Sequence, residues 1–494
     1  MSPATPPDDV PLRTNDGYYP GRVWRTSAPE AQGLDSQALV ELFDAVEAEH
    51  LPIHSLQIVR YGHLVLDAYF HPFEAEARHD VASVTKSITT TLVGLALERG
   101  SIAGLEVPVV PLLTDSPPPD ARALQIRVRD LLTTSSGLAC GPVPYEREML
   151  AMAASPDWVG YALALPMRAA PGTRFEYCSP GFHMLSALIA RTTGLSTEAF
   201  AREALFGPIG ITNWRWPRDP QGINQGAGDL QMRPTDLLRI GHLFLRQGEW
   251  AGRQIVPRAW IAEATRRQVD ASPIDGYGFG WWLPNNLPGL YQAAGRGGQR
   301  LVVWPTKDLV VVITGGGLDV DRLAPHLLRA LKSNAALPPN PAGQQRLAAR
   351  VRAAAQPAAP RATASPPPLP PLAATVSGRT YLLAENALGL RALQLHFLSP
   401  TQAHVRLQLS HTEMIVPIGL DGRYRVAIDP TSDEPVAGRG RWLTPERFSI
   451  EVDTIARINH VTAELDFAND QLRGWARERS GLVPELALNG RARP

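Results

Sequence analysis

Hydrophobic and polar residues follow two different patterns along this chain. Residues 36–50 place Leu39, Leu42 and Phe43 at helical spacing behind a serine that is a suitable helix cap. Residues 56–70 instead alternate as two strands, broken at a Tyr-Gly turn. Both periods occur in the first two thirds of the chain, which predicts a unit of mixed helix and sheet.

Further segments carry the same two signatures. Helices are expected at 83–98, 126–132, 181–193, 226–248 and 320–331. Strands are expected at 301–304 and 309–314, joined by a Pro-Thr-Lys-Asp sequence that is typical of a hairpin turn. Strands near both ends with helices between them predict an antiparallel sheet flanked by helices, together with an all-helical lobe.

A proline-rich segment divides the chain. Ten prolines lie between Pro338 and Pro371, around an Ala/Arg-rich run at 346–355 that favours a helix. Beyond it, short runs alternate between apolar and polar positions, and these runs are 393–397, 405–409, 424–428 and 448–452. This alternation predicts a β-barrel or sandwich of about eight strands.

These patterns divide the 494 residues into four parts. They are an N-terminal arm (1–30), a helix-and-sheet domain (31–335), a Pro/Ala-rich linker (336–374) and a C-terminal β-rich accessory domain (375–494).

The charge balance narrows the class of partner. Lys plus Arg and Asp plus Glu both number 48, so the chain has no net charge that would attract nucleic acid or an anionic membrane. The sequence contains no apolar run long enough to span a membrane and no recognisable signal peptide. As written, the sequence predicts a cytoplasmic protein that acts on a small-molecule substrate. If a signal peptide was removed, the protein would instead be periplasmic or extracellular. Either a monomer or an oligomer is compatible with the sequence.

Lysine is rare in this chain. Among the 48 basic residues, only Lys86, Lys307 and Lys332 are lysines. A buried lysine can lose its proton, whereas arginine in effect cannot. A lysine retained in such an arginine-rich chain is therefore a candidate general base.

Lys86 also lies three residues after a serine, at the start of a predicted helix. This spacing places Ser83 and Lys86 on one face, where the amine can activate the hydroxyl as a nucleophile. About 0.14 such Ser-x-x-Lys matches are expected by chance for this composition. The alternative is a serine that caps the helix and a lysine in solvent.

Four segments together resemble one known family. Residues 81–87 (Val-Ala-Ser-Val-Thr-Lys-Ser) resemble the active-site helix of the serine β-lactamase and penicillin-binding-protein superfamily, in particular its class C-like esterase branch. Residues 128–138, 171–179 and 295–299 match later family segments in the expected order. The resemblance covers about residues 30–333 and implies a β-lactamase-like α/β (α+β) fold, without a metal or other cofactor.

The resemblance also implies catalytic roles. Ser83 would be the acylated nucleophile and Lys86 its base or proton relay. Tyr177 would be a second acid/base that reaches the leaving group, which requires Lys86 and its surroundings to stabilise a phenolate.

The oxyanion hole and the substrate contacts come from the same comparison. One donor would be the Ser83 backbone N–H, and the other an N–H from Gly297, Gly298 or Gln299, where glycine permits close approach. Arg296 is a candidate for binding a substrate carboxylate, with a surface arginine as the alternative.

Two positions depart from the family pattern. Ser179 stands where many relatives have asparagine, which removes an amide that would hold a substrate carbonyl and Lys86. Arg296-Gly297-Gly298 replaces the usual Lys or His followed by Thr/Ser-Gly. Both departures disfavour a β-lactamase.

Three other features leave alternatives open. Cys140 and Cys178 are the only cysteines and lie near matched segments; two separate buried thiols are favoured over a disulfide. Residues 276–282 are rich in aromatic and glycine residues, and they form either a pocket wall or structural packing. His183 is interpreted as a packed or surface histidine.

The leading hypothesis is a serine hydrolase that cleaves esters or small amides through an acyl-Ser83 intermediate. The alternatives are a β-lactamase, a D-amino-acid peptidase, an amide-oligomer hydrolase, or a non-catalytic binder of ligands or peptidoglycan fragments. The C-terminal domain has no recognisable catalytic group. By resemblance, it is expected to cover the mouth of the site or to mediate assembly.

Overall fold

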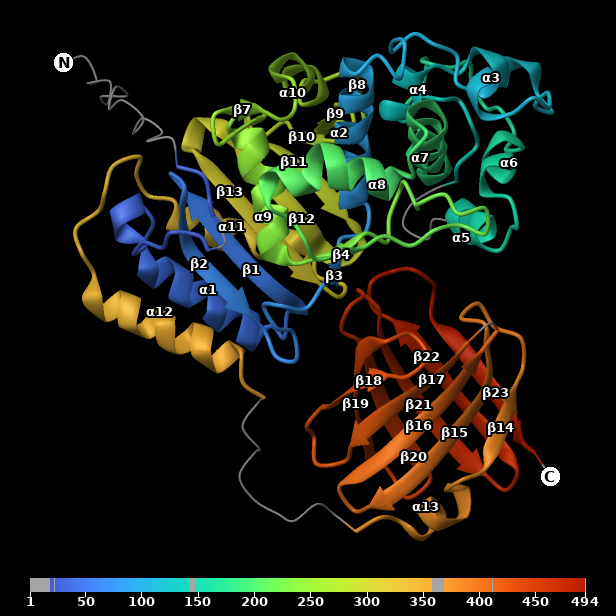
Figure 1. Ribbon diagram of the computed structural model, residues 1–494. Helices are drawn as coiled ribbons and strands as arrows, with labels where there is room; N and C mark the ends of the chain where they lie inside the picture. Colours follow the sequence, from blue (N-terminus) through green and yellow to red (C-terminus); the bar gives the residue numbers. More distant parts are fainter. Residues whose placement is uncertain (1–17, 22, 142–146, 358–367, 411, 494) are drawn as a thin grey trace.

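The computed structural model describes residues 18–21, 23–141, 147–357, 368–410 and 412–493. Figure 1 shows an N-terminal domain of sheet and helices, coloured blue to yellow, beside a C-terminal barrel, coloured orange to red. The predicted architecture, an antiparallel sheet flanked by helices with a helical lobe and a C-terminal β domain, is confirmed.

An antiparallel sheet forms the centre of the N-terminal domain. Its eight described strands lie in the order β2 (His63–Tyr69), β1 (Ile53–Arg60), β13 (Leu309–Gly315), β12 (Gln299–Trp304), β11 (Tyr291–Gly295), β10 (Trp282–Pro284), β9 (Asp275–Tyr277) and β8 (Val269–Asp270). The predicted hairpin is β12–β13, with Trp304 opposite Leu309. Valines on β13 alternate between the two faces of the sheet, so both faces are apolar and both are covered.

Helices cover the two faces of this sheet and form the lobe. Those outside the lobe are α1 (Ser36–Ala48), α2 (Val84–Glu98), α9 (Pro234–Leu245), α10 (Arg258–Ala264), α11 (Ala324–Ala330) and α12 (Pro341–Ala354). Those of the lobe are α3 (Val110–Leu113), α4 (Val128–Leu132), α5 (Arg147–Ala153), α6 (Trp158–Leu163), α7 (Ser179–Thr193) and α8 (Thr197–Ala201). α2 packs against both the sheet and α7, so it joins the two parts.

Short strands complete the domain. They are β3 (His79–Asp80), β4 (Trp214–Arg215) and β5 (Gln231–Met232) in one sheet, and β6 (Glu249–Trp250) and β7 (Arg253–Gln254) in another. β3 ends three residues before Ser83, so this small sheet fixes the chain that leads into the nucleophile helix.

Several predicted helix boundaries differ from the structure, and three of them have a clear local cause. Asp35, rather than the serine, caps α1, because its carboxylate accepts a hydrogen bond from the Gln37 N–H at 2.9 Å. The helix predicted from residue 226 begins at Pro234, since a proline suits the first turn and the preceding residues pair as β5. The predicted helix at 320–331 is divided into a 3-10 turn, Val320–Arg322, and α11.

The C-terminal domain is a closed antiparallel barrel. Its ten strands are β14 (Thr380–Leu383), β15 (Leu390–Ser399), β16 (Gln402–Leu409), β17 (Glu413–Gly419), β18 (Arg425–Asp429), β19 (Glu434–Trp442), β20 (Arg447–Thr454), β21 (His460–Ala468), β22 (Gln471–Glu478) and β23 (Leu486–Ala492), preceded by helix α13 (Pro371–Val376). β14 pairs with β23, and a parallel contact between Gly419 and Arg439 closes the ring. Nine of the described strands form this ring, against about eight expected.

β18 is the strand left outside the ring. It pairs with β19, and its Val426 and Ile428 side chains are 50% and 58% exposed. The alternation at 424–428 suggested a buried apolar face; the face is exposed because no second layer covers β18. The other three runs do contribute to the barrel core.

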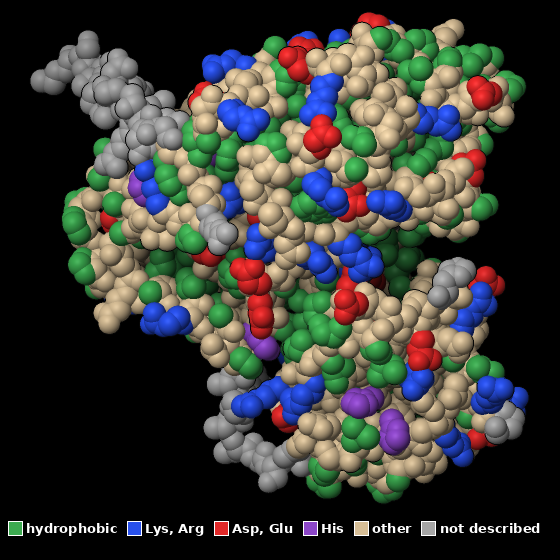
Figure 2. All heavy atoms as spheres, viewed as in Figure 1, with side chains coloured by type: hydrophobic (Ala, Val, Ile, Leu, Met, Phe, Trp, Pro, Cys, Tyr) green, Lys and Arg blue, Asp and Glu red, His purple; other side chains and the backbone are tan. Residues whose placement is uncertain are grey.

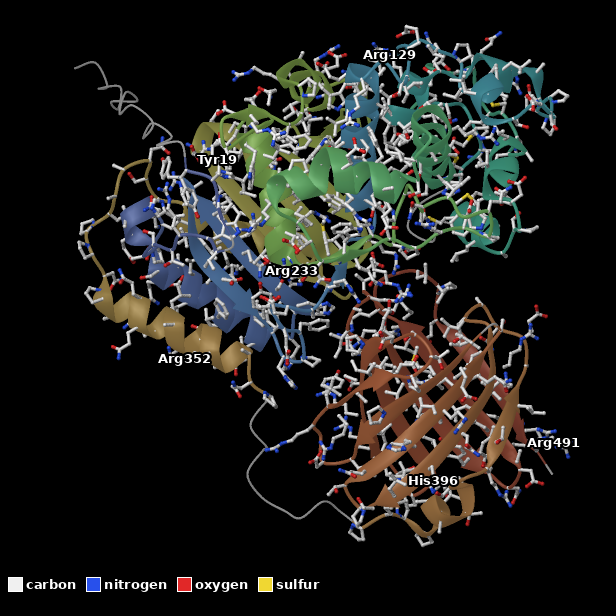
Figure 3. All side chains as sticks on the ribbon, in the orientation of Figure 1. Tyr19, Arg129, Arg233, Arg352, His396 and Arg491 are labelled. Carbon is white, nitrogen blue, oxygen red and sulfur yellow. A yellow bond between two sulfur atoms is a disulfide. The ribbon has the colours of Figure 1, made fainter. Side chains whose placement is uncertain are left out.

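The predicted linker begins as an ordered part of the N-terminal domain. α12 packs along α1, Leu347 is buried in the shared core, and Arg350 forms an ion pair with Glu47 at 3.0 Å. Figure 3 shows Arg352 on the outer side of α12, away from the sheet. Within the described part of the chain, no helix is long and apolar enough to cross a membrane.

Candidate functional site

The predicted nucleophile stands at a sharp turn before α2. Ala82 adopts a left-handed conformation, with φ of 46°, and its N–H donates to the Asp80 carboxylate at 2.7 Å. A non-glycine residue with positive φ is uncommon and often marks a functional turn. Here the turn leaves the Ser83 side chain partly exposed at the start of α2, while Lys86 lies one turn further in, 1% exposed.

The Lys86 amine has three oxygen acceptors. Its Nζ donates to Ser83 Oγ at 2.9 Å, to Ser179 Oγ at 3.0 Å and to the Ala227 carbonyl at 2.9 Å. An ammonium has three N–H donors, so this set satisfies it fully. The structure therefore brings together three predicted residues, Ser83, Lys86 and Ser179, in one hydrogen-bonded group.

Two of these partners come from segments far along the chain. Ser179 is the first residue of α7, because Pro180 begins the helix earlier than residue 181, where the sequence pattern starts. The Ala227 carbonyl lies in the irregular segment before β5 that was predicted to be helical. A backbone carbonyl gives no side-chain signal, so sequence reasoning missed this third partner.

Tyr177 meets Lys86 through its ring. Lys86 Nζ lies 4.7 Å from the centroid of the Tyr177 ring, a cation–π distance. The ring stacks on Trp282 at 5.9 Å, and Trp282 meets Tyr277 edge-on at 5.0 Å. Among the described residues the Tyr177 hydroxyl has no hydrogen-bond partner, so its predicted proton-transfer role stays a prediction. Residues 276–282 thus supply part of an aromatic wall beside Lys86.

The third matched segment forms the turn between β11 and β12. Gly298 has φ of 96°, and a Cβ placed there would lie 2.6 Å from the Leu318 Cβ. A Cβ on Gly295 would lie 2.7 Å from the Val81 carbonyl oxygen. Only glycine fits such close approaches. The end of β11 therefore lies directly against the residues that precede Ser83.

Gln299 braces this turn from within. Its side chain is fully buried, and its Nε2 donates to the Gly315 carbonyl at 2.6 Å and to the Arg296 carbonyl at 3.1 Å. Its side chain is thus used internally, which leaves the backbone of Gly297, Gly298 and Gln299 as the part available for the predicted oxyanion role.

Arg296 points toward the barrel. Its guanidinium donates to Ser480 Oγ and lies 3.9 Å from a carboxylate oxygen of Glu478. Glu478 is the last residue of β22, and Ser480 follows two positions later. The Arg296 side chain is 18% exposed. No local pattern indicated this contact, because 182 positions and a domain boundary separate Arg296 from Glu478.

The barrel also contacts the strand that leads to Ser83. The Asp80 N–H donates to the Ala456 carbonyl at 2.9 Å, and Glu434 accepts hydrogen bonds from Arg457 and Gln231, both at 2.9 Å. Arg215 also donates to Glu434. Figure 2 shows basic and acidic side chains gathered along this boundary. The two units therefore meet through a charged, hydrogen-bonded interface next to the site.

Asp80 is the acidic group closest to the nucleophile along the chain. Burial, and after it the neighbouring Asp229 carboxylate, raise the pKa of its carboxyl to about 7, while the Ala82 N–H, Arg457 and Arg296 oppose the shift. Nothing in the sequence singled out Asp80, since a lone aspartate before a helix is ordinary.

The two cysteines form a disulfide. Cys140 and Cys178 are bonded across a sequence separation of 38 residues. The favoured interpretation of two separate thiols was wrong, because the fold brings the loop after α4 against the start of α7, a proximity that spacing alone does not reveal. Cys178 lies between Tyr177 and Ser179, so the bond anchors both of them.

Other candidates have structural explanations. His183 is fully buried, hydrogen-bonded to Asp219 at 3.0 Å and packed on Trp158, as expected of a packed histidine. Across the described ranges, no group of three His, Cys, Asp or Glu side chains is arranged to hold a metal.

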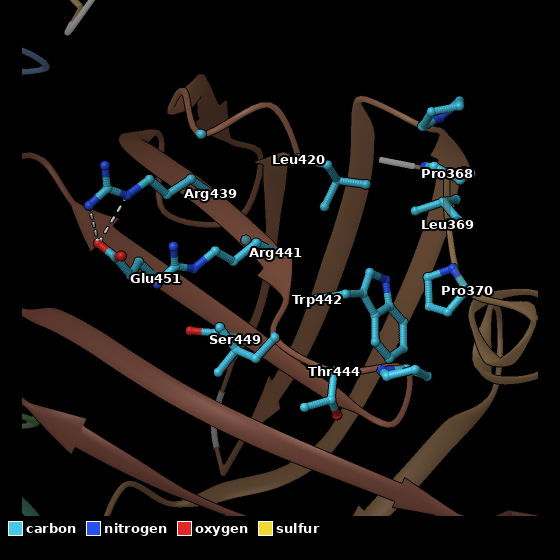
Figure 4. Close-up of a pocket in the computed structure, with 15 residues that line it drawn as sticks. Pro368, Leu369, Pro370, Leu420, Arg439, Arg441, Trp442, Thr444, Ser449 and Glu451 are labelled. Carbon is cyan, nitrogen blue, oxygen red and sulfur yellow. Dashed lines mark hydrogen bonds and ion pairs between the residues drawn. The ribbon is translucent and has the colours of Figure 1, made fainter. Parts of the chain in front are cut away.

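A cavity of about 660 Å³ lies in the barrel, and the residues that line it do not include Ser83. Figure 4 shows the Trp442 ring beside Pro370 at one end and the hydrogen-bonded pair Arg439 and Glu451 at the other. It contains no nucleophile paired with a base, so Ser83 and its partners remain the better candidate.

Comparisons with known proteins cover the domain that contains Ser83. The family model described as Beta-lactamase matches residues 39–332. A 6-aminohexanoate-dimer hydrolase of Paenarthrobacter ureafaciens is 26% identical over 302 residues, covering 55% of this chain and 75% of the relative.

Solved structures share the fold. A Bacillus anthracis protein provisionally named a 6-aminohexanoate-dimer hydrolase aligns with a TM-score of 0.51 at 19% identity, over 67% of this chain and 86% of its own. EstCE1, a hydrolase with promiscuous acyltransferase activity, aligns with a TM-score of 0.51 at 19% identity, over 60% of this chain and 99% of its own.

Proposed function

The chain belongs to the β-lactamase family of serine hydrolases, and from that premise we propose that it cleaves carboxylic esters or small amides through an acyl-Ser83 intermediate. The observation that supports this most directly is the hydrogen bond of 2.9 Å between Lys86 Nζ and Ser83 Oγ. A serine hydroxyl becomes an effective nucleophile when a base lies within hydrogen-bond reach.

The proposed reaction has two halves. Ser83 Oγ attacks the acyl carbon as its proton passes to Lys86 Nζ, a step that requires Lys86 to have released one of its three ammonium protons beforehand. The bond to the leaving group then breaks while that group takes up a proton from Lys86 or Tyr177. Water then attacks the acyl-serine with the same groups as base, which releases the acid and restores Ser83. The oxyanion would be held by backbone N–H groups of Ser83 and of the turn at 297–299.

The walls of the site suggest the substrate class. The stacked rings of Tyr177 and Trp282 offer an apolar surface for an acyl or aryl group. Arg296 offers a guanidinium to a substrate carboxylate. Ser179 lacks the amide that relatives use, so esters with good leaving groups are expected to react faster than β-lactams.

The first test is hydrolysis of p-nitrophenyl butyrate. Wild type should release nitrophenolate, and Ser83→Ala should lose at least about 10³-fold in kcat/KM. Ser116→Ala, an exposed serine in the same domain, is the matched control and should stay at the wild-type rate. Mass spectrometry of the quenched enzyme should find the butyryl adduct on the peptide that contains Ser83. A folded but inactive wild type would favour the non-catalytic binder.

Amide hydrolysis is the second candidate. It is favoured by the relative at 26% identity, whose name gives the 6-aminohexanoate dimer as its substrate. Release of free amine from that dimer, compared with a penicillin and a D-aminoacyl amide at equal concentration, ranks the three amide activities. Loss of each activity in Ser83→Ala assigns it to this site.

A further inference from the structure

The guanidinium of Arg296 is held by the barrel alone. Its one hydrogen bond to a described residue is to Ser480 Oγ, and Glu478 is the one carboxylate within 4 Å. The backbone of the turn is held by the N-terminal domain instead: the N–H groups of Gly317 and Leu318 donate to the Gly297 carbonyl at 3.1 and 3.0 Å. One domain thus shapes the turn, and the other positions its charged side chain.

Glu478 is built to receive this charge. Its side chain is 1% exposed, and it accepts hydrogen bonds from the N–H groups of Ser480 at 3.0 Å and Leu482 at 2.8 Å. The Ser480 hydroxyl donates to the same carboxylate at 2.5 Å. With its proton directed to Glu478, Ser480 Oγ is free to accept from Arg296. The three groups form a chain in which each bond strengthens the next.

Burial explains why this chain matters. A buried carboxylate is stable only with hydrogen bonds and a counter-charge, and here the counter-charge comes from the other domain. The guanidinium has five N–H donors in a fixed plane, and one is used by Ser480. Holding one side of that plane orients the remaining donors before a substrate arrives, which lowers the entropy cost of binding.

We propose that Glu478 and Ser480 are positioning residues, which hold Arg296 in the orientation that binds a carboxylate on the acyl group of the substrate. The barrel is then a working part of the substrate pocket. This inference rests on the proposed function for the location of the pocket, but its test measures binding and does not need turnover.

The test compares two stable amides that differ in one group. Succinyl p-nitroanilide carries a carboxylate where butyryl p-nitroanilide carries a methyl group. Their Kd values are measured by quenching of tryptophan fluorescence in the full chain with Ser83→Ala. Adding Glu478→Gln or Ser480→Ala should raise the Kd of the succinyl amide about 5- to 20-fold and change that of the butyryl amide less than about 2-fold.

A double-mutant cycle identifies the route of the effect. Arg296→Met should raise the Kd of the succinyl amide at least as much as Glu478→Gln does. The double variant should have the same Kd as Arg296→Met alone, because Glu478 acts on the substrate only through the Arg296 side chain. Glu478→Asp, which keeps the charge, should recover part of the loss. Glu485→Gln, in the exposed Arg477–Glu485 pair of the same hairpin, is the matched control and should bind like the parent.

Each outcome decides one question. Additive effects of Arg296→Met and Glu478→Gln, equal losses for both amides, or no binding of the succinyl amide by the parent would overturn the positioning role. Wild type that binds the succinyl amide selectively but hydrolyses neither ester nor amide would refute the proposed reaction and leave the positioning role standing.

Discussion

The two sides of the candidate site are supported in different ways. On one side, the Lys86 amine reaches Ser83, Ser179 and the Ala227 carbonyl, all within the N-terminal domain. On the other, the side chain of Arg296 depends on Glu478 and Ser480 of the barrel. Under the proposals above, proton transfer would use groups of one domain, whereas the charge offered to the substrate would depend on how the two domains dock.

This difference separates chemistry from selectivity. Variants on the Lys86 side should lose turnover on every substrate. Variants at the barrel interface should change stability or substrate preference first, and they should leave the reaction of a neutral ester largely intact.

The largest effect is expected from Lys86→Arg. Arginine keeps the positive charge but in effect cannot give up its proton, so kcat/KM for p-nitrophenyl butyrate should fall about 10²- to 10⁴-fold. Thermal unfolding shows whether the larger side chain is tolerated, and Lys86→Gln provides a smaller replacement. Activity within 10-fold of wild type in both folded variants would remove Lys86 from the reaction.

The disulfide supports the Lys86 side alone. Replacing Cys140 and Cys178 together by alanine should lower the free energy of unfolding by about 4 kcal/mol, because the unfolded chain is no longer closed into a loop across the 38-residue separation. Since Cys178 adjoins Tyr177 and Ser179, turnover should fall while the Kd ratio of the two amides stays unchanged. Denaturant unfolding and the binding assay measure the two quantities. A changed ratio would mean that the two sides are not independent.

Glu434→Gln tests the interface away from Arg296. Glu434 is buried and accepts hydrogen bonds from Arg457, Arg215 and Gln231. Removing its charge should lower the free energy of unfolding by about 2 kcal/mol. This is less than for a fully buried ion pair, because both arginine side chains are about one-third exposed or more and solvent screens them. Added salt should reduce the difference in the free energy of unfolding between Glu434→Gln and wild type, because salt screens the ion pairs. Urea unfolding at low and high salt measures this, and an unchanged midpoint would show that the pairs contribute nothing to docking.

Asp80→Asn should change stability in a way that depends on pH. The pKa of Asp80 is about 7 in the folded protein and about 3.8 in the unfolded chain, so between these values the folded state holds a proton that the unfolded state releases. The contribution of Asp80 to the free energy of unfolding therefore falls as pH rises from 4 to 7 and stays low above that.

The asparagine does not titrate and keeps an oxygen for the Ala82 N–H. Compared with wild type, Asp80→Asn should gain relative stability as pH rises from 4 to 8. Urea midpoints of both proteins across this range provide the measurement, and the difference between them cancels the other titrating groups. A constant difference would show that the pKa of Asp80 is not raised.

Local sequence patterns predicted many of the helices and strands of this molecule, but they did not predict contacts between segments that are distant in the sequence. The period of apolar residues located α1, the β1–β2 pair and the β12–β13 hairpin, because these elements are encoded by neighbouring residues. The spacing of Ser83 and Lys86 predicted their shared face for the same reason. The Ala227 carbonyl and the Cys140–Cys178 bond depend on how loops pack, and no local pattern encodes that.

The barrel shows the same limit. Alternation predicted strands, but it did not separate the ring from β18, whose apolar residues Val426 and Ile428 are exposed. Nor did it indicate that Glu478 would face Arg296 across a domain boundary, since a charged residue at a strand end is ordinary until its partner is known.

The scarcity of lysine has a practical consequence for labelling. Of the three lysines, Lys86 is buried with all its donors in use, whereas Lys332 is exposed and Lys307 partly so. An amine-reactive dye or resin should therefore modify the side chains of Lys332 and Lys307 and spare the candidate site. Lys307 lies in the β12–β13 turn and Lys332 follows α11, both in the N-terminal domain, so the protein can be immobilised with its barrel unmodified by lysine chemistry.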